Sequence, residues 1–252
     1  MKYQRLIPII VPVLVLLLCE LFLRVPAFFY SALALGALLI VLALKYIGPP
    51  NKINWLLFMI LPLLFFISFA AYTSVIIGYF WIQLGFLLIF SFLFIYLRAV
   101  YYYANYQEEA QWSNKLDNLG IAGSFLVVFA TAAVLFILPT FFNLSLWLML
   151  LSVALVIALL LFHFKSFKPG SAWPSQSVIG INVLILTELA WAFSLLPLNF
   201  NILALFLALA YYLDLTIIRL ERRGQLNRQS LKLPLIASLL LFIGLLLTAR
   251  WL

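Results

Sequence analysis

Long uncharged stretches recur along the whole chain, and they constrain its fold more than any other feature. Runs of 18 or more residues without a charged side chain alternate with short segments that carry most of the charge. An α-helix needs about 20 apolar residues to cross the hydrocarbon core of a bilayer. Since 67% of the residues are hydrophobic and only 9% are charged, a soluble core is not a credible alternative. The sequence therefore predicts a multi-pass membrane protein.

The predicted fold class is all-α, a polytopic transmembrane helix bundle of about nine spans in a single integral membrane domain, residues 1–252. The first span follows a basic start like that of a signal peptide. The residues after it, from Glu20 to Pro26, offer no small-residue cleavage site, so we expect this span to remain. The predicted spans are about 6–23, 27–46, 53–76, 79–98, 119–138, 142–164, 177–196, 200–219 and 231–249.

Residues between and within the spans predict local features. The longest polar stretch, from Arg98 to Asn118, mixes charged side chains with Tyr and Trp, which prefer the headgroup level. It therefore predicts an interfacial segment after the fourth span. Pro62 predicts a kink in the third span, Gly78 predicts an outer turn, and Gly224 predicts a helix stop.

A weak internal repeat is visible in the outer turns. Leu138–Asn143 and Leu196–Asn201 both place a proline shortly before Phe and Asn, and their prolines are 58 residues apart. This spacing suggests four tandem helical hairpins of one orientation plus a final helix, unlike the inverted repeats of many secondary transporters. Alternatively, tight outer turns of membrane bundles attract these residue types without any repeat.

The placement of basic residues predicts the topology. In the nine-span arrangement the side of the N-terminus holds thirteen of the 15 Lys and Arg residues, and only Arg24 and Arg250 lie on the other side. Basic residues in short loops stay cytoplasmic, so we expect a bacterial cytoplasmic (inner) membrane protein with the N-terminus inside and the C-terminus outside. The net charge of +8 then indicates contact with anionic lipid headgroups rather than with nucleic acid.

Glu188 is the most unusual charged residue, because it is predicted near mid-bilayer. It lies about 17 Å from the cytoplasmic end of its span and about 12 Å from the outer end, with no Lys or Arg expected at that depth. Desolvation favours a neutral carboxyl group there, and Asn182 is one candidate partner. Two interpretations stay open: a protonated acid that fixes helix packing, or a proton or ion site in a transport path.

Two other acids have simpler explanations. Asp214, about 8 Å from the cytoplasmic end of its span, is within reach of snorkelling basic residues. Glu20 and Arg24 are four residues apart and predict an interfacial ion pair. The basic cytoplasmic patch that follows Asp214 could dock an acidic partner or anionic lipids; it consists of Arg219, Arg222, Arg223, Arg228 and Lys232.

The sequence offers little catalytic chemistry. Cys19 has no possible intramolecular disulfide partner, and His163 is the one histidine, so we expect no metal site and no cofactor. A cation near a helix C-terminus is a sufficient role for His163. Glu108–Glu109 lacks the further residues of intramembrane proteases with paired glutamates, and Ser124 lacks an activating histidine. We therefore expect no enzyme.

The block Thr187–Trp191 through Leu195–Phe200, with Ala210–Leu213 on the next span, resembles an uncharacterised family of bacterial multi-pass membrane proteins found mainly in candidate phyla. The resemblance covers roughly the last third of the chain and implies no activity. The predicted function is a non-catalytic structural or partner-binding membrane subunit, with a protein partner or a second copy of the chain. The alternative is a small-molecule or ion transporter that uses Glu188.

Overall fold

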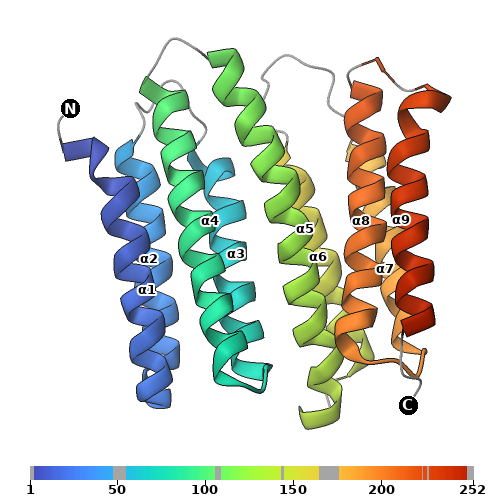
Figure 1. Cartoon of the computed structure of the whole chain (residues 1–252), viewed down its shortest axis with the longest axis horizontal. Coiled ribbons are helices and arrows are strands. Elements are labelled where there is room, and N and C mark those ends of the chain that lie inside the picture. Colours follow the sequence, from blue (N-terminus) through green and yellow to red (C-terminus); the bar gives the residue numbers. More distant parts are fainter. Residues whose placement is uncertain are drawn as a thin grey trace. The chain divides into compact units, whose positions relative to one another are not determined.

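A computed structural model describes residues 3–47, 55–105, 109–142, 145–164, 176–222, 224–225 and 227–248. Within these ranges all regular secondary structure is helical, and nine helices are long and apolar enough to cross a membrane, which confirms the predicted fold class (Figure 1). In order, the elements are η1 (Tyr3–Arg5), α1 (Ile7–Arg24), η2 (Pro26–Phe28), α2 (Phe29–Ile47), α3 (Trp55–Val75), α4 (Tyr79–Asn105), α5 (Glu109–Phe142), α6 (Leu146–Phe164), α7 (Gln176–Ser194), α8 (Phe200–Arg222) and α9 (Arg228–Thr248).

Helices α4 and α5 are longer than predicted. α4 continues past Arg98 to Asn105, and α5 begins at Glu109, so the polar stretch belongs to these helices apart from residues 106–108, which lie outside the described residues. The polar stretch is therefore helical, and its place at the membrane interface stays a prediction. α5 also runs on to Phe142, which places Pro139 inside its last turn rather than in the loop.

Aromatic pairing explains how polar residues fit into these helix extensions. The rings of Tyr102 in α4 and Trp112 in α5 stack with their centroids 4.5 Å apart, and the Nζ atom of Lys115 lies 4.8 Å from the centre of the Trp112 ring. A cation over an aromatic face is attracted by the ring quadrupole. The extra turns are therefore stabilised by contacts between the two helices.

Residue contacts divide the chain into two compact units, although the sequence predicts a single domain. The N-terminal unit comprises Met1–Ser124 and Phe162–Phe167, and the C-terminal unit comprises Phe125–Leu161 and Lys168–Leu252. In the N-terminal unit α1 packs on α2 and α4, and α3 packs on α2 and α4 (Figure 1). In the C-terminal unit α8 packs on both α7 and α9. Helices outside the predicted hairpins pack together as well, as α1 does on α4 and α8 on α9, so the repeat of four hairpins stays a prediction.

A ladder of rings forms much of the core between α3 and α4. Phe65 stacks on Phe69 at 4.6 Å and on Phe92 at 3.9 Å between ring centroids, and Phe92 stacks on Tyr96 at 5.7 Å. Gly36 of α2 lets that helix approach closely, because a Cβ atom there would lie 2.5 Å from the ring of Phe66. Small residues at such crossings favour helix packing in membranes.

Two buried polar side chains, those of Tyr96 and His163, hydrogen-bond to backbone carbonyls near the start of α3. Pro62 has no N–H group, so the carbonyl of Phe58 loses its usual helical donor four residues later. The hydroxyl of Tyr96 donates to that carbonyl at 3.0 Å, and both residues are buried. Membrane helices tolerate proline where such a neighbour satisfies the freed group. The side chain of Tyr96 thus replaces the hydrogen bond that Pro62 removes.

His163 lies at the end of α6 as predicted, but its side chain is not accessible as a cation at that helix end would be. Its ring is fully buried, and Nδ1 lies 2.6 Å from the carbonyl oxygen of Leu57. Because a carbonyl only accepts, Nδ1 carries the hydrogen and donates. The predicted interaction with the C-terminus of its own helix is replaced by a bond from α6 to α3.

The turns confirm the predicted helix boundaries. Gly78, between α3 and α4, has φ +116°, a conformation that side chains with a Cβ atom rarely adopt. Gly224 after α8 has φ +63°, and its N–H donates to the carbonyl of Glu221 at 2.9 Å, as at a glycine-ended helix. The Asn199 side chain accepts a bond from the N–H of Asn201 at 2.9 Å and caps α8.

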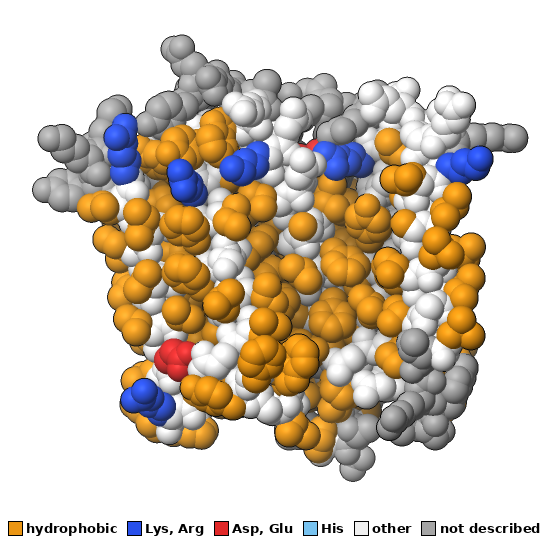
Figure 2. Space-filling model, viewed as in Figure 1, with side chains coloured by type: hydrophobic (Ala, Val, Ile, Leu, Met, Phe, Trp, Pro, Cys, Tyr) orange, Lys and Arg blue, Asp and Glu red, His pale blue; other side chains and the backbone are white. Residues whose placement is uncertain are grey.

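The C-terminal unit has its own apolar core around α8. Phe206 lies 4.3 Å from Phe242 of α9 and 5.8 Å from Phe193 of α7 between ring centroids. Most other side chains of α9 are exposed, including Leu233 and Leu247 at 81% each. In Figure 2 hydrophobic side chains cover most of the visible face, and Lys and Arg side chains are confined to the ends of helices. Such a surface suits contact with lipid chains.

Replacing Tyr96 by Phe tests the compensation of Pro62. Tyr96→Phe leaves the Phe58 carbonyl buried without this donor and should lower the free energy of unfolding by about 1–3 kcal/mol. In a Pro62→Ala background, where the helical N–H is restored, the same substitution should cost less. Thermal unfolding in detergent measures both effects, with Tyr30→Phe as the control, since Tyr30 is 81% exposed. Equal costs in the two backgrounds would contradict the compensation.

Candidate functional site

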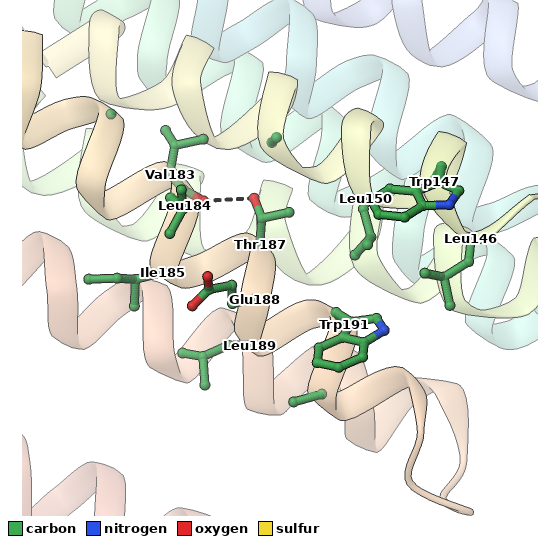
Figure 3. A pocket seen from close by; sticks show the side chains of 13 residues that line it. Leu146, Trp147, Leu150, Val183, Leu184, Ile185, Thr187, Glu188, Leu189 and Trp191 are labelled. Atoms are coloured by element: carbon green, nitrogen blue, oxygen red, sulfur yellow. Dashed lines mark hydrogen bonds between the residues drawn. The ribbon is translucent and has the colours of Figure 1, made fainter.

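A large groove runs along the outside of the C-terminal unit between α6 and α7. Its volume is about 1030 Å³. Most of its side chains are exposed, so it is open along its length rather than enclosed (Figure 3). The lining residues are Leu146, Trp147, Leu150 and Ala154 from α6, and Gly180, Val183, Leu184, Ile185, Thr187, Glu188, Leu189, Trp191 and Ala192 from α7.

Glu188 contributes the one carboxylate among the described residues of this lining. Its side chain is exposed, and the described residues give it no hydrogen bond or ion pair. The neighbouring hydroxyl of Thr187 donates instead to the carbonyl of Val183 in its own helix, at 2.7 Å (Figure 3). The groove therefore presents an acid in apolar surroundings without supplying it a donor from these residues.

The predicted mid-bilayer depth of Glu188 stays a prediction. Glu188 lies six positions before Ser194 at the nearer end of α7, a rise of about 9 Å, and Asp214 lies eight positions before Arg222 at the end of α8, about 12 Å. What distinguishes Glu188 is its exposure to the apolar groove. An acid in such a place costs free energy until a donor or water reaches it.

Tryptophans mark one end of the groove. Trp147 is 80% exposed at the start of α6, and Trp191 is 49% exposed one turn beyond Glu188 on α7 (Figure 3). Trp side chains gather at the level of lipid headgroups. On α7, Glu188 follows Leu184 by four residues and Trp191 follows Glu188 by three, a spacing that could have indicated this face from the sequence. The pairing of this face of α7 with α6 could not have been indicated, because it joins separate helices.

The other predicted site residues do not join Glu188. Asn182 and Asp214 are not part of the groove lining. Asp214 is partly buried in α8, and its Oδ2 atom is buried without a hydrogen bond in the described part of the chain. Arg219 follows five residues later with a partly buried side chain, so the snorkelling contact stays a prediction.

The remaining predicted sites lie at helix ends. Glu20 is partly exposed and Arg24 is exposed, both at the end of α1, and their ion pair stays a prediction. In the basic patch, Arg222 ends α8, Arg228 begins α9, and Lys232 is exposed in the first turns of α9. Arg223 lies outside the described residues. Among the residues that are described, no three His, Cys, Asp or Glu side chains gather as metal ligands would.

Comparison with known proteins found no match for the chain among protein-family models, curated proteins or solved structures. The resemblance of its last third to an uncharacterised bacterial membrane family therefore stays a prediction.

Removing the carboxylate should stabilise the isolated protein. Glu188→Leu replaces an acid that lacks a donor from the described residues by a side chain that detergent or lipid chains can cover, so the melting temperature should rise. Glu188→Gln keeps the polarity but not the charge, so its melting temperature should lie between those of the wild type and Glu188→Leu. Leu184→Met, at an exposed position one turn away, is the control and should change little. A lower melting temperature for Glu188→Leu would show that the acid stabilises the protein.

Proposed function

We propose that the chain is a non-catalytic, partner-binding subunit of the bacterial cytoplasmic membrane, and that its partner occupies the α6–α7 groove. The observation that carries this proposal is the exposed carboxylate of Glu188 in an apolar groove between two membrane-crossing helices. In hydrocarbon such a group needs a hydrogen-bond donor. A second protein that supplies this donor would remove the free-energy cost of the unsatisfied carboxylate, and this gain would strengthen its binding.

The occupant that fits best is a transmembrane helix of a different protein with Lys, Arg, Asn, Gln or His at the depth of Glu188. The α7 wall extends from Gly180 to Ala192, about 18 Å, which is three turns of a helix. Gly180 faces open space, with no atom within 4 Å of an added Cβ, and Ala154 and Ala192 are also small. Small side chains of this kind let a second helix approach closely.

The proposed orientation has the N-terminus in the cytoplasm and the C-terminus outside. It is supported by the thirteen basic residues that the nine spans would place on the side of the N-terminus. The basic patch around Arg219 and Lys232 would then lie against the anionic headgroups of the cytoplasmic leaflet.

A transporter that uses Glu188 as a proton or ion site is the second candidate. The specific observation in its favour is that Glu188 reaches a cavity of about 1030 Å³. A hydrophilic solute needs polar groups along its path, however, and the rest of the described lining is almost entirely apolar. Transport would be detected as flux into proteoliposomes whose pH dependence is lost in Glu188→Gln.

Site-specific photo-crosslinking in cells tests the partner proposal. A photoreactive residue at Leu184, in the groove, should give one discrete protein adduct, whereas the same residue at Leu87 of α4, which is also exposed, should give only lipid adducts. Sequencing the adduct should identify a transmembrane segment with a donor side chain. The adduct should be lost in Glu188→Leu and partly kept in Glu188→Gln.

Three results would contradict the proposal: only lipid adducts from Leu184, an adduct that does not respond to Glu188, or an adduct between two copies of this chain. The last result would assign the groove to a homo-oligomer.

A further inference from the structure

A second, smaller cleft lies in the N-terminal unit where α1 begins and α4 ends. Its volume is about 300 Å³, at the lower end of the range for ligand sites. Pro8 and Ile9 of α1 and Phe94 of α4 form its apolar part. Its polar part consists of Arg5, Arg98, Tyr101 and Tyr102. The cleft therefore changes from apolar to cationic toward the ends of these helices.

The guanidinium groups are held in place by the two tyrosines. Arg98, Tyr101 and Tyr102 share one face of α4, since they are three and four residues apart. The Nε atom of Arg5 donates to the hydroxyl of Tyr101 at 3.4 Å, and the guanidinium of Arg98 lies 5.6 Å from the centre of the Tyr102 ring. Stacking and hydrogen bonding of this kind orient an arginine before a ligand arrives.

No acid is found among the described residues that line this cleft. An anion between the guanidinium groups of Arg5 and Arg98 would be attracted to both. Guanidinium groups match phosphate oxygens in a bidentate geometry. Beside them, Ile9 is 50% exposed and can lie along an acyl chain.

We propose that this cleft binds a phosphate group, as carried by the headgroup of an anionic phospholipid. The phosphate lies between Arg5 and Arg98, and the acyl chains follow the apolar surface of Ile9 and Phe94 away from the helix ends. Basic pockets between transmembrane helices recognise lipid headgroups by the same chemistry. The site is independent of the α6–α7 groove, so its test does not depend on the proposed partner.

The experiment measures the thermal stability of the full chain in zwitterionic detergent micelles. Phosphatidylglycerol, phosphatidylcholine or inorganic phosphate is added in separate arms. A ligand that binds only the folded state raises the melting temperature with concentration. We expect phosphatidylglycerol to stabilise the protein and phosphatidylcholine to have little effect. Stabilisation by inorganic phosphate alone would assign the same site to a soluble phosphate compound.

Variants of the two arginines localise the effect. Arg5→Gln and Arg98→Gln should each weaken phosphatidylglycerol binding about tenfold, because each loses a hydrogen bond to a charged group. Arg98→Lys keeps the charge but loses the bidentate guanidinium geometry, so its phosphatidylglycerol binding should be intermediate. Lys45→Gln is the control, since Lys45 is exposed at the end of the neighbouring α2 and lies outside the cleft.

Two results would overturn the site. One is an equal loss of binding in Lys45→Gln, which would indicate attraction to the whole basic surface rather than to the cleft. The other is wild-type protein that none of the phosphate-bearing ligands stabilises, a result that does not depend on whether the arginine variants fold.

Discussion

A polar group inside hydrocarbon has no water to bind, and this constraint governs the whole molecule. Helices satisfy it for the backbone, because each N–H and carbonyl bonds within its own segment. Where a residue breaks this pattern, the chain must supply another donor. At Pro62 the chain does so, with the hydroxyl of Tyr96. At Glu188 the described residues supply none, and this contrast is the physical basis for assigning a partner to the α6–α7 groove.

The same constraint explains why the nine spans could be predicted from the sequence. Whether a segment crosses a membrane depends on the hydropathy of its own 20 or so residues, which is a local property. The turns at Gly78 and Gly224 were also predictable, because a positive φ depends mainly on the residue that adopts it. The ends of α4 and α5 were not. Their polar residues are helical because Tyr102 and Trp112 pair across two helices, and no local pattern indicates that pairing.

The candidate sites could be predicted only in part. The sequence identified Glu188 as unusual because of its predicted depth, and the structure adds its exposure to a groove whose second wall is α6. The role of His163 was assigned from its position at a helix end. Its contact with Leu57, 106 residues earlier in the chain, depends on tertiary packing, which no local sequence pattern indicates.

The bond between Tyr96 and Phe58 also has an evolutionary consequence. If Pro62 is replaced by a residue with an amide hydrogen, the hydroxyl of Tyr96 is no longer needed. If the hydroxyl of Tyr96 is lost first, the protein is less stable until Pro62 is also replaced. Positions 62 and 96 should therefore change together among orthologues, and this covariation would mark the contact between α3 and α4.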